Sequence, residues 1–366
     1  MDRKAYLILE NGEVFEGTAF GAEKETMGEL VFTTAMTGYL ETLTDPSYFG
    51  QVVLQTFPLI GNYGVIPADF ETDSPVLKGY IVREWCQEPS NFRCEGQLDT
   101  FLKEKGVTGI CGLDTRAITR IVREYGVLNC KIKYTPDVTA EELEKLKNYR
   151  IVDAVESTTS QEFEVFEGEN DKYHIALMDF GAKHNIGREL QKRGCKLTIV
   201  PAHTTAEEIL ALNPDGIMLS NGPGDPAENV QVIEELKKLT EKKIPIFGIC
   251  LGHQLLALSR GGKTEKLHYG HRGANQPAKE LATGRVFITS QNHGYAVVSD
   301  SLPEDAEVSF VNGNDGTCEG VNYTDMPAFS VQFHPEACGG PQETSFLFDR
   351  FIDMIEKNKE QNVNAQ

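Results

Sequence analysis

From about residue 173 onward, the sequence alternates between short apolar runs and amphipathic stretches. The runs YHIALMDFG and CKLTIVPA are separated by KHNIGRELQKRG, and DGIMLS is followed by a loop and the charged stretch VQVIEELKKLTEKK. Apolar runs that alternate with amphipathic helices predict a parallel sheet with helices on both faces. In such sheets the functional residues gather at the carboxyl ends of the strands. We therefore expect an open, mostly parallel α/β domain over residues 173–358.

The first part of the chain has a different character. Residues 1–155 combine glycine-rich turns with short β-type stretches such as KAYLILENGEVFEGTAFG, which predicts a separate, mixed and strand-rich α+β domain. The polar, acidic residues 156–172 predict a linker, and residues 359–366 predict a frayed tail. A chain of 366 residues is long enough for two domains that each bury a core.

The amino-acid composition argues against nucleic acid and membranes as partners. The chain is 40% hydrophobic and 25% charged, which is typical of a soluble globular protein. Its formal net charge of −20 leaves no excess of Lys and Arg to neutralise a phosphate backbone, so we expect no nucleic-acid partner. The sequence shows neither a signal-type apolar segment nor a run long enough to cross a bilayer, so we expect a cytoplasmic protein that does not bind membranes.

The cysteines show no metal or disulfide pattern. The chain has eight of them, with no CxxC pair and no dense clustering with histidine. This spacing disfavours a disulfide framework and a zinc site, and we expect no metal in this chain. Most of these cysteines are expected to be small buried residues in a reducing compartment.

One cysteine has an unusual setting. In PIFGICLGHQLL, Cys250 lies between Gly248 and Gly252, where an apolar strand turns into a helix. A lone cysteine is by default a buried residue, but these glycines permit the tight strand-to-helix turn of a nucleophile elbow. The helix that follows directs its N–H groups toward the sulfur and favours the thiolate, and the Leu251 N–H could bind an oxyanion. We interpret Cys250 as a nucleophile.

A cysteine nucleophile needs a base and an acceptor that orients the base. Both occur in FSVQFHPE, where His334 and Glu336 lie two residues apart after another apolar strand. The carboxylate could hold the imidazole in one tautomer. The alternative is a turn with a surface carboxylate, and the elbow makes that alternative the weaker one.

The loop SNGPGDP follows the strand DGIMLS. Gly222 and Gly224 would let a substrate approach the backbone, and N–H groups exposed there could form the other half of an oxyanion hole. The alternative is a plain turn, which Gly and Pro always suggest.

Taken together, SNGPGDP, GICLGHQ and HPE resemble the class I (triad) glutamine amidotransferases, and their order and spacing fit over the second half of the chain. In that family a cysteine attacks the side-chain amide of glutamine and forms a glutamyl thioester. Histidine protonates the departing ammonia, and water then releases glutamate. The resemblance implies that Cys250 is the nucleophile, His334 the acid and base, and Glu336 its orienting partner.

The first half is similar to the carbamoyl-phosphate synthase small-subunit family, through TTAMTGYLETLTDPSYFGQ, FPLIGNYGV and GICGLDTRAITRIVREYG. This resemblance implies a set of glutamine-binding residues, for several of which a structural role is the alternative. They are Ser47, Gly222, Gly224, Leu251, Gln254, Asn292, Gly294 and Tyr295. The stretch TRAITRIVRE predicts a basic amphipathic helix, normally a solvated face, in the domain by which the family contacts its large subunit.

The resemblance also implies the partner. A separate large subunit would use ATP, with a divalent metal, and bicarbonate to turn the ammonia into carbamoyl phosphate. This chain would need no cofactor, in line with its lack of a GxxxxGK[ST] loop. Carbamoyl phosphate made in this way would feed arginine or pyrimidine synthesis. Two alternatives stay open: a free-standing cysteine hydrolase of γ-glutamyl or peptide amides, and a catalytically silent scaffold that binds a synthase.

One departure from the expected pattern follows the HPE motif. The chain continues with ACGGPQET, which places a second thiol, that of Cys338, close in sequence to the candidate base. Cys338 does not lie at an elbow, and we expect it to be a bystander.

Overall fold

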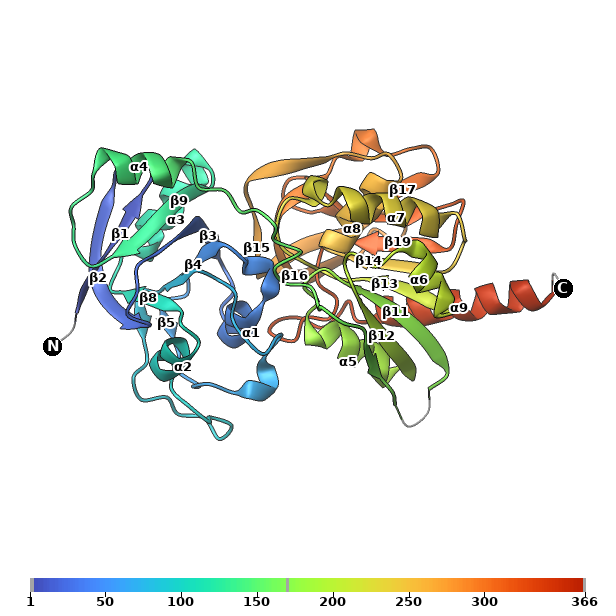
Figure 1. Cartoon of the computed structure of the whole chain (residues 1–366), viewed down its shortest axis with the longest axis horizontal. Coiled ribbons are helices and arrows are strands. Elements are labelled where there is room, and N and C mark those ends of the chain that lie inside the picture. Colours follow the sequence, from blue (N-terminus) through green and yellow to red (C-terminus); the bar gives the residue numbers. More distant parts are fainter. Residues whose placement is uncertain (1–2, 169–170, 365–366) are drawn as a thin grey trace. The chain divides into compact units, whose positions relative to one another are not determined.

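The computed structural model describes residues 3–168 and 171–364, and the chain forms two compact units, Met1–Val152 and Asp153–Gln366 (Figure 1). The segment predicted as a linker, 156–172, therefore belongs to the second unit. It contains strand β10 (Glu164–Phe166), which pairs antiparallel with β12 (Cys195–Pro201). Strand pairing uses backbone groups, so a polar sequence does not prevent it. Residues 169 and 170 of this segment lie outside the described residues.

The first unit is built on a closed barrel with strand order β1-β2-β8-β6-β4-β3-β9. Closure removes the exposed strand edges that an open sheet would present. The barrel strands are β1 (Lys4–Leu9), β2 (Val14–Gly21), β3 (Thr26–Thr33), β4 (Gln51–Gln55), β6 (Gly79–Ile81), β8 (Thr108–Cys111) and β9 (Leu128–Lys133).

Helices and short elements surround this barrel. They are α1 (Tyr39–Thr44), α2 (Leu98–Glu104), α3 (Thr115–Tyr125), α4 (Ala140–Lys147), the 3-10 turns η1 (Pro46–Tyr48) and η2 (Pro67–Asp69), and the strand pair β5 (Leu59–Ile60) and β7 (Glu84–Trp85). Helix α3 is the predicted basic amphipathic helix. Asp114 caps it by accepting from the Ala117 N–H at 3.0 Å. Ile118 and Val122 are buried while Arg116 and Arg120 are exposed, as expected of an amphipathic helix.

Within the described residues, the second unit has a ten-stranded sheet of order β10-β12-β11-β13-β14-β19-β18-β17-β15-β16. The strands from β12 to β19 pair in parallel, and the remaining neighbours pair antiparallel. Strands not yet given bounds are β11 (Tyr173–Asp179), β13 (Gly216–Leu219), β14 (Ile246–Ile249), β15 (Thr264–Glu280), β16 (Val286–Val297), β17 (Ala306–Asn312), β18 (Cys318–Tyr323) and β19 (Ala328–Val331).

Helices cover both faces of the parallel part of this sheet (Figure 1). Helices α6 (Ala206–Ala211), α7 (Val230–Thr240) and α8 (Leu251–Ser259) bury one face, and α5 (His184–Lys192) and α9 (Phe346–Asn364) bury the other. The remaining short turns are η3 (Pro226–Glu228) and η4 (Ser299–Ser301). Successive side chains of a strand point to opposite faces of the sheet, and both faces are buried under helices. This explains why the strand sequences are continuously apolar. The predicted fold class, a strand-rich domain followed by an open α/β domain, is confirmed.

Helix α9 extends through most of the segment predicted as a frayed tail, because its apolar face packs on the sheet through Leu347, Phe348, Phe351 and Ile355. Residues 365 and 366 of that tail lie outside the described residues. Among the described helices, none combines the length and apolar character needed to cross a bilayer.

The aromatic core under α9 generates a stability prediction. Phe247 of β14 is fully buried, and its ring centroid lies 4.4 Å from that of Phe329 and 5.6 Å from that of Phe348. Phe247→Ala should lower the free energy of unfolding by about 3 to 5 kcal/mol, because it leaves a cavity. Phe163→Ala, which removes a ring that is 45% exposed, is the control and should cost less than about 1 kcal/mol. Denaturant unfolding followed by circular dichroism measures both, and equal losses would contradict this account of the core.

Candidate active site

Cys250 occupies a strained backbone position between β14 and α8. Its φ is 53° and its ψ −103°, a region that a non-glycine residue adopts only when its surroundings enforce it. The flanking glycines allow the turn. A Cβ on Gly248 would lie 2.9 Å from the Gly252 carbonyl carbon, and one on Gly252 would lie 2.5 Å from the Leu219 carbonyl oxygen. The turn predicted from GICLG is therefore present.

Strand register brings the second motif to the same edge of the sheet. Ile249 pairs with Val331 on the parallel neighbour β19, and the Cys250 N–H donates to the Val331 carbonyl at 2.9 Å. His334 follows three residues after Val331. Its Nδ1 lies 2.7 Å from Oε1 of Glu336, and both side chains are buried. The structure thus brings Cys250, His334 and Glu336 to neighbouring strand ends.

A buried lysine completes this cluster. Lys183 Nζ lies 3.5 Å from His334 Nδ1 and 3.7 Å from Glu336 Oε1. The Lys183 backbone N–H donates to the Asn221 side-chain oxygen at 3.0 Å, which ties it to the loop after β13. Sequence reasoning missed Lys183. The only available signal was its position just after strand β11, at the edge where parallel sheets carry their functional residues.

The charges in this cluster set the protonation of the histidine. Burial and the Lys183 charge oppose an imidazolium, but Glu336 and Cys250 outweigh them and raise the pKa of His334. Burial likewise opposes the Glu336 carboxylate, but His334 and Lys183 outweigh it and hold the pKa of Glu336 below its usual range. Because Nδ1 donates to Glu336, Nε2 is the ring atom available for proton transfer. Within the described residues, Nε2 is buried without a hydrogen-bond partner.

Three of the predicted glutamine-binding residues lie on β16, opposite β15. The Asn292 carbonyl lies 3.7 Å from the Cys250 sulfur, and a Cβ on Gly294 would meet the Arg272 guanidinium at 3.2 Å. The Tyr295 carbonyl accepts from Nε2 of Gln254 at 2.8 Å. Gln254 Nε2 also donates to Gln332 at 2.9 Å. The Gln254 amide group therefore links the elbow helix α8 to β16.

The predicted oxyanion-binding elements also come together. Leu251 is the first residue of α8, and Gly222 lies beside it, since a Cβ on Gly222 would be 2.7 Å from the Leu251 side chain and 2.3 Å from the Phe180 carbonyl oxygen. The Gly252 N–H donates to the Ser220 carbonyl at 3.0 Å, which anchors the loop to the helix. Gly224 has a φ of 90°, a conformation that favours glycine.

Ser47 lies in the first unit, within η1. Its backbone N–H donates to the Asp45 side chain at 2.9 Å, which forms the turn that DPS suggests. That Ser47 also reaches glutamine stays a prediction.

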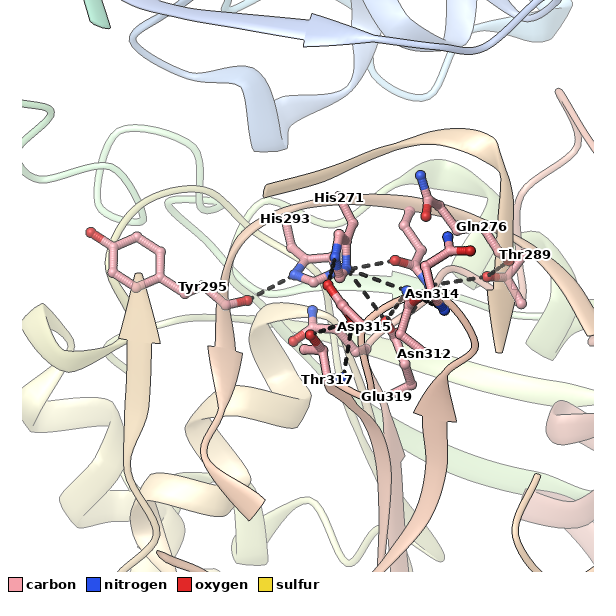
Figure 2. A network of polar contacts seen from close by, with 12 residues as sticks. His271, Gln276, Thr289, His293, Tyr295, Asn312, Asn314, Asp315, Thr317 and Glu319 are labelled. Carbon is pink, nitrogen blue, oxygen red and sulfur yellow. Dashed lines mark hydrogen bonds and ion pairs between the residues drawn. The ribbon is translucent and has the colours of Figure 1, made fainter. Parts of the chain in front are cut away.

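One group of described residues has candidate metal-ligand atoms close enough together to suggest a metal site. The atoms of His271, His293 and Glu319 all lie within 4.8 Å of one another, and Figure 2 shows the polar contacts around them. Both Glu319 oxygens already accept hydrogen bonds, from Asn312 and from Gln291. These side chains form a hydrogen-bond network that sequence reasoning also missed.

Comparison with known proteins agrees with this geometry. Residues 176–354 match the family model described as glutamine amidotransferase class-I, and residues 7–132 match the carbamoyl-phosphate synthase small chain, CPSase domain. The second unit is therefore a class-I glutamine amidotransferase domain.

Relatives match nearly the whole chain. The carbamoyl phosphate synthase small chain of Clostridium perfringens is 52% identical over 95% of this chain and 99% of its own. Those of Listeria monocytogenes serotype 4b and Bacillus cereus (strain ATCC 14579) are 50% and 51% identical, over 99% and 98% of both chains. The chain belongs to the carbamoyl phosphate synthase small chain family, and the resemblance inferred from its motifs is confirmed.

The elbow predicts a strict requirement for glycine. Gly252→Ala places a methyl group against the Leu219 backbone, so it should lower the free energy of unfolding by at least about 2 kcal/mol and displace Cys250. Gly187→Ala is the matched control, because that glycine lies inside α5 with 3.4 Å to its nearest neighbour atom. It should be neutral or stabilising by up to about 1 kcal/mol. Thermal and denaturant unfolding measure both, and similar values for the two variants would contradict the packing argument.

The charge cluster predicts opposite pKa changes at His334. Glu336→Gln removes the carboxylate that favours the imidazolium and should lower the His334 pKa, whereas Lys183→Met removes an opposing charge and should raise it. The imidazole titration, followed by NMR on histidine-labelled protein, measures both. Shifts of the same sign would contradict the assignment.

The same pKa makes stability depend on pH. Folding raises the pKa of His334, so protonation of this ring contributes to the free energy of unfolding. That contribution is complete below the ordinary histidine pKa of about 6.5, and it is lost as the pH rises through the pKa of His334 in the folded protein.

Proposed function

We propose that this chain is the glutamine-hydrolysing subunit of a carbamoyl-phosphate synthase. The observation that supports this most directly is the strained Cys250, held at the same sheet edge as the buried His334–Glu336 pair. A nucleophile on an enforced turn beside an oriented imidazole is the arrangement that acyl transfer requires. Membership of the small chain family supports glutamine as the substrate.

In the proposed reaction, the Cys250 sulfur attacks the side-chain amide carbon of glutamine, and a thioester forms as the C–N bond breaks. The His334 imidazolium gives its proton from Nε2 to the departing ammonia. His334 then takes a proton from water, which attacks the thioester and releases glutamate and the Cys250 thiolate. Glu336 keeps Nδ1 protonated and orients the ring throughout.

Backbone N–H groups would stabilise the tetrahedral intermediate. Leu251, at the start of α8, and the loop of Gly222 and Gly224 are the proposed oxyanion hole. The proposed glutamine-binding residues are Ser47, Gln254, Asn292, Gly294 and Tyr295. Since the amide hydrogens of Gln254 are used by Tyr295 and Gln332, its carbonyl oxygen is the atom proposed to meet the substrate.

The ammonia would pass through the protein to a separate large chain, which would use ATP, a divalent metal and bicarbonate. This chain would hold no cofactor of its own, and the complex would work in the cytoplasm. Family membership supports the large-chain partner, because the relatives are named small chains of the same synthase.

The test is glutamate release from glutamine by the purified chain, alone and with a carbamoyl-phosphate synthase large chain plus ATP, magnesium and bicarbonate. We expect weak hydrolysis that rises with the large chain and falls at least about a thousandfold in Cys250→Ala, which lacks the nucleophile. Cys338→Ala, which removes an exposed thiol, is the matched control and should retain activity.

Three outcomes would overturn the proposal. Turnover indifferent to the large chain would favour a free-standing hydrolase. Activity that survives loss of Cys250 would mean another nucleophile. Binding of the large chain without any turnover would favour a silent scaffold.

A further inference from the structure

A polar network lies against segment Gln291–Tyr295 of β16, and the proposed reaction makes no use of it (Figure 2). Glu319 of β18 is its centre. This side chain is completely buried, yet its Oε1 accepts from Asn312 Nδ2 at 2.9 Å and its Oε2 accepts from Gln291 Nε2 at 3.0 Å. Burial raises the pKa of Glu319. The nearby His271 opposes that rise, and so do the hydrogen bonds from Asn312 and Gln291.

His271 supplies the countercharge. Its Nε2 lies 2.8 Å from Asp315 Oδ2 and its Nδ1 3.5 Å from Glu319 Oε1. Burial opposes the charge on this ring, but the two carboxylates outweigh it and raise the pKa of His271. The imidazolium and the two amide donors therefore offset part of the cost of burying the Glu319 carboxylate.

The orientation of both amides follows from their other partners. Asn312 Oδ1 accepts from the Asn314 N–H at 2.9 Å, so Asn312 Nδ2 must face Glu319. Gln291 Nε2 also donates to Thr289, so its Oε1 faces His293 Nε2 at 3.2 Å. Asn312 Nδ2 lies 2.9 Å from Glu319 Oε1 and 3.5 Å from His271 Nδ1, and an amide donor so close to two of the three candidate ligand groups would repel a cation. This argues for a hydrogen-bond network and against a metal site.

The network ends at the candidate active site. His293 Nδ1 lies 2.8 Å from the Tyr295 carbonyl, which accepts from Gln254 of the elbow helix. Burial holds the pKa of His293 well below its usual range, so the neutral ring donates to one of its two acceptor neighbours, the Tyr295 carbonyl or Gln291 Oε1. His293 pairs across the strands with His271, and their ring centroids are 4.9 Å apart. Between Gln291 and His293 lies Asn292, whose carbonyl is the 3.7 Å neighbour of the Cys250 sulfur. Segment Gln291–Tyr295 therefore contacts Glu319 through its first residue, and it contacts the elbow through the carbonyls of Asn292 and Tyr295.

We infer that Glu319 is a positioning residue, which through Gln291 and His293 holds segment Gln291–Tyr295 in the shape that binds glutamine. This inference rests on the proposed function and deepens it. Glu319 acts on the shape of this segment and takes no part in the proposed chemical steps, so its removal should weaken substrate binding much more than it slows chemistry.

Glu319→Gln tests this with almost no change of shape. The new amide must point its NH2 group at either Asn312 Nδ2 or Gln291 Nε2, so two donors face each other, and His271 loses a countercharge. We expect the KM for glutamine to rise at least about tenfold while kcat at saturating glutamine stays within about threefold. The assay uses the complex with the large chain, where synthesis from added ammonia should stay unchanged. Glu307→Gln, on an exposed position of β17, is the matched control.

A second substitution separates positioning from general damage. Adding Asn312→Asp to Glu319→Gln gives the new amide an acceptor and returns a carboxylate near His271, so KM should fall at least about threefold from the single variant. If Glu319→Gln does not fold, Asp315→Asn takes its place as the test. This substitution weakens only the contact between Asp315 and Nε2 of His271, and it should raise the KM for glutamine at least about threefold.

The inference is overturned if the KM of Glu319→Gln lies within about twofold of the wild-type value, or if kcat falls while KM does not change. An Asp315→Asn variant with unchanged KM, in the absence of folded Glu319→Gln, would overturn it as well. Failure of the proposed function looks different, because the wild-type complex itself would then release no glutamate or Cys250→Ala would remain active.

Discussion

The turn at Cys250 is the constraint on which the candidate active site depends. The chain leaves β14 with a positive φ at a non-glycine residue and must at once begin a helix that lies against β13. Only residues without a Cβ allow that approach, since Gly252 sits directly over the Leu219 backbone. The strain is sustained because α8 is buried along most of its length, through Leu251, Leu255 and Leu256, so the surrounding core enforces the turn.

Two buried charge clusters flank this turn within the second unit. One combines Lys183, His334 and Glu336, and the other combines His271 and Glu319 with the half-exposed Asp315. Removing charges from water is costly unless each finds partners, so each cluster tolerates very few arrangements. That intolerance is useful in a site where a thiol, an imidazole and a strand must keep fixed relative positions. Stability is a less convincing reason for burying so many charges.

Much of the second unit could be predicted from its pattern, because strands buried on both faces are continuously apolar and their helices are amphipathic. The antiparallel part was harder to foresee. Strand β15, with the sequence TEKLHYGHRGANQPAKE, is polar and shows no regular alternation, and β10 lies in a segment whose composition predicts a linker. In both, the strand conformation comes from backbone pairing with a neighbour distant in sequence, which local composition does not record.

The sequence by itself determined the turn at Cys250, the helix that follows it, and the pairing of His334 with Glu336. These depend on local rules: glycines around a cysteine specify a turn, and only Pro335 separates His334 from Glu336. Only the tertiary structure decided which other charges join them. Lys183 reaches His334 across 151 residues, and Glu319 reaches Gln291 across 28. A lysine or a glutamate is exposed by default, so its burial is decided only when the sheet forms and register places it beside a partner.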